Sequence, residues 1–174
     1  MRPSGPRVLV VARHAKTEQG GPDHERALLE RGRRDAAVAG RWLEAEVGRP
    51  DLVHVSTSRR TRQTWRAMAA TAGATGAELW PDRRLYLGHP EDLLAVLTET
   101  PEEAGVVVLV GHSPGVPALV THLAHPDRSE PGALAELAAG FPTMACAVLE
   151  VDGGWAALGE ASAVLRGVHV ARGR

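Results

Sequence analysis

Cysteine, lysine and long apolar runs are scarce in this chain of 174 residues. Cys146 is the one cysteine, so no disulfide can form within the chain, as is typical of proteins from a reducing compartment. No apolar run approaches the roughly 20 residues that a membrane-spanning helix needs. The first residues, Met1–Pro6, lack the apolar core of a signal peptide. We therefore expect a cytoplasmic protein that does not bind a membrane.

An excess of charge of one sign is also missing. The 20 basic residues nearly balance the 21 acidic ones, and the net charge is −1 with His counted as neutral. Such a balance gives no overall attraction to nucleic acid or to an anionic membrane. A length of 174 residues is typical of one domain with its own core, so we expect residues 1–174 to form a single domain. The oligomeric state is left open.

Two apolar runs, Val8–Val11 and Val106–Val110, indicate strands that are covered on both faces. Continuous β-branched runs are typical of a parallel sheet between two layers of helices. Further strands are expected at 52–55, 78–80, 146–151 and 163–170, the last two around a turn at 152–154; helices are expected at 31–47, from a cap at 56–58 to about 72, at 91–99 and at 114–124. This alternation predicts a three-layer α/β/α domain with a mostly parallel central sheet.

The polar residues that end the two apolar runs are candidates for a functional site. Arg13 and His14 follow the first run, and His112 follows the second. Ligands of parallel sheets bind beyond the carboxyl ends of the strands, so these side chains are expected to converge on one crevice. A basic group that contains Arg60 begins the helix after residue 58. Guanidinium groups and helix N-termini bind phosphate oxygens, and a neutral imidazole can attack phosphorus, so the pattern predicts a phosphoryl site.

Three motifs, in this order, resemble the histidine phosphatase (phosphoglycerate mutase-like) superfamily. Arg13-His14-Ala15 resembles its Arg-His-Gly signature, with alanine in place of glycine. The segment 56–64 is similar to its second-arginine segment, and 111–115 is similar to its second-histidine turn. Shorter stretches resemble the small phosphohistidine phosphatases of the SixA type, at 23–28, 30–32, 85–86, 91–94 and 141–143. The resemblance implies a phosphoglycerate mutase-like fold.

The resemblance also implies a role for each matched residue. His14 would be the nucleophile that carries a phosphohistidine intermediate, and His112 would be the second catalytic histidine. Arg13 and Arg60 would bind the phosphoryl oxygens. Arg60 is preferred to Arg62 because it stands three residues before a glutamine, as the family pattern requires. Neither a metal ion nor another cofactor is implied.

Two further residues have two interpretations each. Arg26 could reach the phosphate or could form a solvated salt bridge. Glu91 could be a general acid, but after Pro90 it also suits the first turn of a helix. Without an acid an alkyl phosphate ester is disfavoured, because its alkoxide needs a proton. The SixA-type resemblance implies phosphohistidine on a protein as the substrate, and the site chemistry favours the same choice because an imidazole leaving group needs less help from an acid. A small phosphomonoester is the alternative.

A serine hydrolase is a different interpretation of the second-histidine turn. The turn formally matches a Gly-x-Ser-x-Gly nucleophile elbow around Ser113, and Asp127 or Asp152 and then His169 follow in serine-hydrolase order. The elbow needs a backbone N–H directly after the serine, and Pro114 has none. This interpretation also leaves the two arginines and the first histidine unexplained, so it is disfavoured.

Three other classes of function fit the residues less well. A phosphate-binding module that has lost catalysis is opposed by the presence of all four central residues. Nucleic acid binding by the arginines at 59–66 is opposed by the lack of interleaved aromatics apart from Trp65. A metal site at His122 and His125 is opposed by the lack of a carboxylate or cysteine pattern around them.

Overall fold

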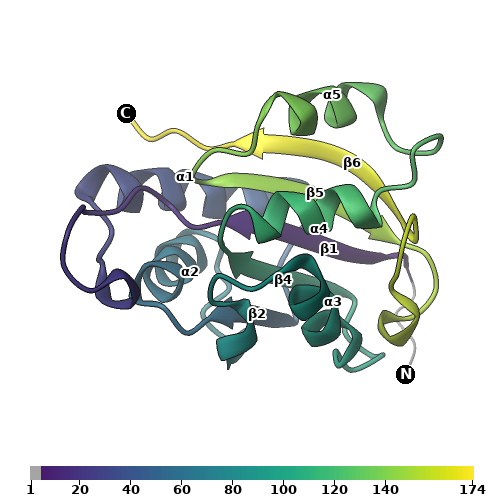
Figure 1. The fold of residues 1–174 in the computed structure, drawn as a ribbon, viewed down its shortest axis with the longest axis horizontal. Coiled ribbons are helices and arrows are strands. Elements are labelled where there is room, and N and C mark those ends of the chain that lie inside the picture. The colour runs from purple at the N-terminus through teal and green to yellow at the C-terminus, as the bar shows by residue number, and fades with distance from the viewer. Residues whose placement is uncertain (1–4) are drawn as a thin grey trace.

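The protein is described over residues 5–174 by a computed structural model, so the expectation for Met1–Pro6 lies mostly outside the described residues. The strands are β1 (Arg7–Arg13), β2 (Leu52–Ser56), β3 (Glu78–Asp82), β4 (Val106–Gly111), β5 (Ala145–Val151) and β6 (Ala163–Val170). They form one sheet in the order β3-β2-β4-β1-β5-β6 (Figure 1). The pairs from β3 to β1 are parallel, whereas β5 and β6 are added antiparallel, so the sheet is mostly parallel as predicted.

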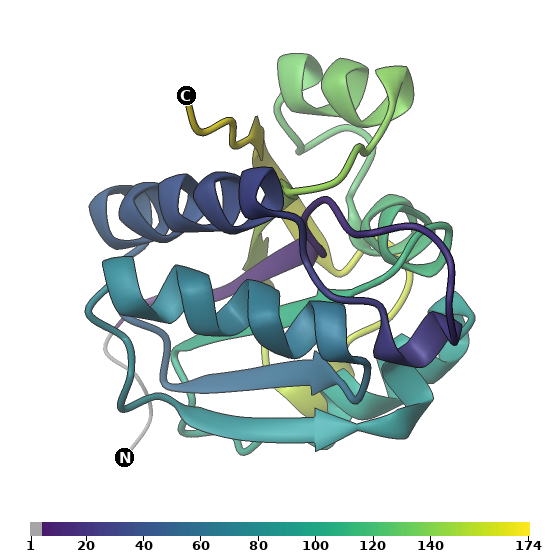
Figure 2. The ribbon, with the colours of Figure 1, turned by 90° about the vertical axis from the view of Figure 1, so that its left-hand side faces the viewer.

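Helices cover both faces of the sheet. They are α1 (Glu30–Glu46), α2 (Arg59–Thr71), α3 (Pro90–Thr98), α4 (Gly115–Leu123) and α5 (Pro131–Ala139). α1 and α2 lie side by side on one face (Figure 2), and α3, α4 and α5 contribute to the apolar cluster on the other. The three-layer α/β/α prediction is therefore confirmed. Among residues 5–174 no helix has both the length and the apolar character needed to cross a membrane.

The two central strands divide their side chains between the two layers. On β1, Leu9 and Val11 belong to the cluster under α3 and α4, and Val10 and Ala12 belong to the cluster under α1 and α2. Successive side chains of a strand point to opposite faces, so an uninterrupted apolar run is what a doubly covered strand requires. This explains why the run at 8–11 predicts a central strand correctly.

Two features at the C-terminal end differ from the expectations. α5 was not expected; it begins at Pro131 and ends at Gly140, which has a φ of +141°. The connection between β5 and β6 is not a tight turn at 152–154, because it includes a 3₁₀ helix at Trp155–Ala157. Trp155 is fully buried, and its indole N–H donates to the carbonyl of Ala104 at 2.9 Å. The buried ring of Trp155 therefore anchors this connection to the segment that precedes β4.

The contact between α1 and α2 depends on a glycine. A Cβ on Gly40 would collide with the carbonyl oxygen of Met68 and with the hydroxyl of Thr71. That hydroxyl donates to the carbonyl of Ala37 at 2.8 Å, so it bridges the two helices where they approach closely. The close approach positions α2, which carries Arg60.

We predict that Gly40→Ala lowers the free energy of unfolding by roughly 1–3 kcal/mol, because overpacking against a backbone carbonyl forces the helices apart. Urea denaturation measures the change. Gly132→Ala is the control: no atom lies within 4 Å of a Cβ at Gly132, so stability should be unchanged or higher by roughly 0.5 kcal/mol. Equal stability of the two variants would contradict the prediction.

Candidate active site

The four residues singled out from the motifs line one pocket at the carboxyl end of the parallel strands. Arg13 ends β1 and His14 follows it, His112 follows β4, and Arg60 lies in the first turn of α2. The rings of His14 and His112 are 5.2 Å apart between centroids. The remaining lining residues are Lys16, Thr17, Gln19, Asp23, Arg26, Leu87, Ser113 and Thr143, and we call the whole the histidine pocket.

His14 is held as a neutral ring with a defined tautomer. Its Nδ1 lies 2.8 Å from the carbonyl oxygen of Ala15, and a carbonyl can only accept, so Nδ1 carries the proton. The lone pair is then on Nε2. Burial lowers the pKa of His14 to about 4, and the positive charges of Arg60 and Arg13 act in the same direction. At neutral pH this ring is therefore uncharged, and its Nε2 lone pair is available for nucleophilic attack.

His112 is hydrogen-bonded through Nε2, whereas His14 is hydrogen-bonded through Nδ1. Its Nε2 lies 2.8 Å from the hydroxyl oxygen of Ser56, and the N–H of Ser58 donates to that oxygen at 3.4 Å. The Ser56 hydroxyl can donate to Nε2, and with this assignment the proton of the neutral ring is on Nδ1. Nδ1 is buried and has no hydrogen-bond partner within residues 5–174. Burial, followed by His14 once it is protonated in acid and by the charge of Arg60, lowers the pKa of His112 to about 3.

Arg60 is a buried cation held by an acidic residue. It is 2% exposed, and its two terminal nitrogens donate to the Asp23 carbonyl at 2.6 Å and to the Asp23 carboxylate at 3.0 Å. Arg26 and the Tyr86 hydroxyl donate to the same carboxylate, each at 2.6 Å. The hydrogen bond from Tyr86, followed by that from Arg60, holds the pKa of Asp23 well below its usual range. Asp23 is therefore ionised at neutral pH and cannot act as a proton donor.

Arg13 is oriented by a backbone carbonyl group. One of its terminal nitrogens donates to the carbonyl oxygen of Phe141 at 2.9 Å. Partial burial lowers the pKa of Arg13, but a guanidinium group stays charged in a protein. Arg13 and Arg60 thus supply two fixed positive charges beside the neutral rings of His14 and His112. This arrangement suits a doubly negative phosphoryl group.

The structure separates the other predicted residues into two groups. Arg26 lines the histidine pocket through its bond to Asp23, whereas Arg62 is exposed and lies outside it. Glu91 does not line the pocket; it lines a separate hollow with Leu94 and other residues of α3 and α4. As its sequence position suggests, Glu91 lies in the first turn of α3.

Alanine at position 15 is accommodated in the core of the protein. Ala15 is fully buried, and its N–H donates to the Thr64 hydroxyl at 3.0 Å. That hydroxyl donates in turn to the Arg60 carbonyl at 2.7 Å. The first-histidine and second-arginine motifs are therefore joined directly through these bonds.

Two functional residues were not assigned a role from the sequence, namely Asp23 and Tyr86. The ring of Tyr86 also contacts His112 edge-on, with centroids 5.5 Å apart. Both residues belong to short stretches that resemble the SixA type, and that was the available signal. Their role depends on side chains that are 63 residues apart in the sequence.

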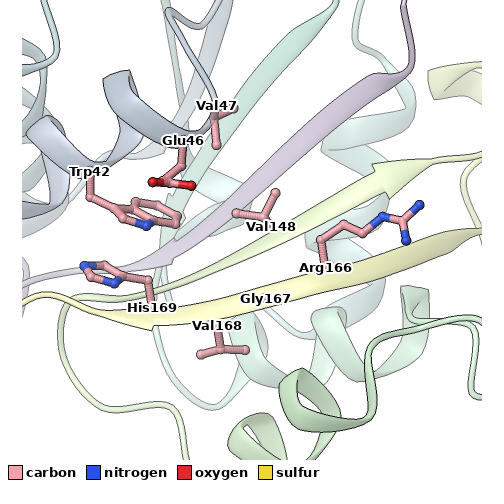
Figure 3. Close-up of a pocket in the computed structure, with 8 residues that line it drawn as sticks. All are labelled: Trp42, Glu46, Val47, Val148, Arg166, Gly167, Val168 and His169. Carbon is pink, nitrogen blue, oxygen red and sulfur yellow. The ribbon is translucent and has the colours of Figure 1, made fainter.

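The serine-hydrolase residues are not brought together. Ser113 lines the histidine pocket, but His169 lies on β6, where its ring stacks on Trp42 with centroids 4.6 Å apart (Figure 3). Asp152 accepts from Arg128 at 2.6 Å and contacts neither of them. No catalytic triad is formed. Over residues 5–174, no three His, Cys, Asp or Glu side chains are grouped as they would be to hold a metal ion.

The sequence and the fold of this chain are both similar to those of known proteins. The sequence profile of the histidine phosphatase superfamily (branch 1) matches residues 9–86. An uncharacterized protein of Mycobacterium tuberculosis is 36% identical over 162 residues, which cover 92% of this chain and 99% of that protein.

Two solved structures with substantial sequence identity have the same fold. One, from Nakamurella multipartitia, is provisionally assigned as the phosphohistidine phosphatase SixA; it is 36% identical with a TM-score of 0.85, over 96% of this chain and 97% of that one. The other, from Agrobacterium tumefaciens, has the same provisional assignment; it is 30% identical with a TM-score of 0.73, over 85% and 94% of the two chains.

We predict that the free energy of unfolding falls between pH 7 and pH 5, in part through His14. An unfolded histidine takes up a proton near pH 6.5, but the folded His14 does so only near pH 4. The stability from its neutral form is present above pH 6.5 and is lost as the pH falls toward 4, by roughly 2 kcal/mol at pH 5. Urea denaturation at both pH values should show a smaller fall for His14→Asn. An equal fall in both proteins would contradict this.

Proposed function

Because this chain belongs to the histidine phosphatase superfamily, we propose that it hydrolyses phosphohistidine on a protein through a covalent intermediate on His14. The observation that carries the proposal is the pair of neutral histidine rings, 5.2 Å apart, in one pocket with two guanidinium groups. One ring offers a lone pair on Nε2, and the other offers an N–H. A phosphoryl group placed between them would be attacked from one side and stabilised from the other.

The reaction proceeds in two steps. Nε2 of His14 attacks the phosphorus and forms an N–P bond while the N–P bond of the substrate breaks. The substrate imidazole leaves as a neutral ring, because its other nitrogen takes a proton from solvent. Water then attacks the phosphorus of phospho-His14 and the N–P bond breaks, so that Nε2 regains its lone pair while Nδ1 keeps its proton. The protons of that water stay on the released phosphate or pass to solvent.

The charges around the pocket support both steps. The N–H of His14 Nδ1 donates to the Ala15 carbonyl, so the positive charge that develops on the attacked ring is stabilised. Arg13 and Arg60 stabilise the charge on the equatorial phosphoryl oxygens. The N–H of His112 Nδ1 supplies a further donor to those oxygens.

The choice of substrate rests on the absence of a protonated carboxyl group among the described residues that line the pocket. Its carboxylate, Asp23, is kept ionised by Tyr86 and Arg60, and Glu91 lies in another hollow. An alkoxide leaving group needs a proton from the enzyme, whereas imidazole does not. The names of the two 30–36% identical structures point to the same substrate.

We predict that His14→Ala lowers the rate of phosphate release from a phosphohistidine peptide by at least about 10³-fold, because the nucleophile is lost. The rate of the wild type should be the same with and without a chelator. His122→Ala removes an exposed histidine outside the pocket and should leave the rate unchanged. Equal release by wild type and His14→Ala would remove His14 from the mechanism and favour a binding module.

We predict that kcat/KM for a phosphohistidine peptide exceeds that for an alkyl phosphate ester by about 10²-fold or more, because general acid catalysis of alkoxide departure is missing. Glu91→Gln should leave both values unchanged. Faster turnover of the ester, with loss of that activity in Glu91→Gln, would establish a small-molecule phosphomonoesterase instead.

A further inference from the structure

The groove between α2 and β3 is lined by arginines that the histidine pocket does not use. Arg59, Arg62 and Arg66 are exposed residues of α2, and Leu79 and Pro81 line the groove from β3. We call this feature the arginine groove. β3 is the last strand at its end of the sheet, and Figure 2 shows α2 running along its neighbour β2. The groove is therefore accessible to an extended chain.

The three guanidinium groups are not neutralised by the protein itself. Within residues 5–174, none of them forms an ion pair with a carboxylate. Glu25 interacts electrostatically with Arg62 and Arg59. Its pKa is lowered first by a hydrogen bond from His24 and then by the charges of these arginines. Glu25 already accepts from His24 at 3.0 Å. The positive charge of the groove thus remains available to a partner.

The positions of these arginines oppose the stability of α2. The first turn of a helix favours acidic side chains, yet that of α2 contains none and begins with Arg59. Arg59 and Arg62 are three residues apart and Arg62 and Arg66 are four apart, so like charges are neighbours on one face. A local arrangement that works against the helix indicates a functional constraint. A negatively charged partner would account for it.

The arginine groove begins beside the histidine pocket. Arg59 directly precedes Arg60, which lies in the pocket with His14. Gln63 lines the groove, and its side-chain oxygen accepts from the N–H of Leu28 at 2.8 Å, in the segment that follows the Asp23 loop. A protein whose phosphoryl group enters the pocket can therefore extend a segment along α2.

We propose that the arginine groove docks an extended acidic segment of the phosphoprotein substrate, an inference that rests on the proposed function. Aspartate and glutamate side chains of that segment pair with Arg59, Arg62 and Arg66 through bidentate hydrogen bonds. Leu79, which is 43% exposed, offers apolar contact along the opposite wall. A nucleic acid fits less well, because the aromatic ring in the groove, Trp65, is 5% exposed and cannot stack on a base.

Binding of two labelled peptides tests the docking directly. Fluorescence anisotropy at low salt compares an oligoglutamate peptide with an oligoglutamine peptide of equal length, neither of them phosphorylated. The wild type should bind oligoglutamate at least about tenfold more tightly, and the double variant Arg62→Glu/Arg66→Glu should lose this preference. The matched control is Arg33→Glu/Arg41→Glu, which changes the charge equally on exposed positions of α1 and should keep the preference.

Several outcomes would overturn the docking proposal. Equal binding of the two peptides by the wild type would do so, as would equal loss of preference in both double variants. Binding of a single-stranded oligonucleotide that Arg62→Glu/Arg66→Glu abolishes, without any preference between the peptides, would assign the groove to nucleic acid instead.

A kinetic measurement separates this proposal from the proposed function. The substrates are two phosphohistidine peptides with glutamate or glutamine flanks, and the quantity is the ratio of their kcat/KM values. We expect the ratio to fall about tenfold in Arg62→Glu/Arg66→Glu and to stay unchanged in Arg33→Glu/Arg41→Glu. If the wild type hydrolyses neither peptide, the proposed function fails, and the anisotropy result alone decides whether the groove binds acidic segments.

Discussion

Parallel pairing of β1 with β4 is the constraint on which the site depends. The two strands are in register from Val8 opposite Val106 to Arg13 opposite Gly111, so their carboxyl ends stop at one level. The N–H of His14 donates to the Gly111 carbonyl at 3.1 Å, which continues the ladder by one residue. A slip of one residue would move every side chain of the shifted strand from one apolar layer to the other. The burial of the whole core therefore keeps the two histidines adjacent.

Desolvation of charge is the second constraint, and it explains the state of each group in the pocket. A buried guanidinium group needs a partner, and Asp23 supplies one to Arg60 while it also binds Arg26 and Tyr86. The histidine rings have no carboxylate bonded to them, so burial beside these cations keeps His14 uncharged. The same positive environment stabilises a phosphoryl dianion and disfavours a positive charge on either histidine ring. Attack on phosphorus by a neutral imidazole requires both conditions.

Much of the fold and of the pocket could be predicted from local sequence. The apolar run at 106–110 predicts a central strand because every side chain of such a strand is buried on one face or the other. Ser58 caps α2 as its position suggests. α5 could not be predicted in this way, because its buried residues Ala133 and Leu137 make a weak pattern and its packing depends on β6. The pairing of Asp23 with Tyr86 is equally non-local. Neither residue has a neighbour in the sequence that signals the contact.

The sequence by itself determined the order along the chain of the strands and of every α-helix except α5, the family, and the choice of Arg60 over Arg62 through its spacing to Gln63. These properties depend on periodicity and on motif spacing, which are local. Only the tertiary structure decided that Glu91 lines a different hollow and that an ionised Asp23 binds Arg60, Arg26 and Tyr86. It also decided that arginines without an ion-pair partner among residues 5–174 line a groove beside β3. Protonation state and charge pairing depend on burial and on distances between remote segments, and these quantities exist only once the chain has folded.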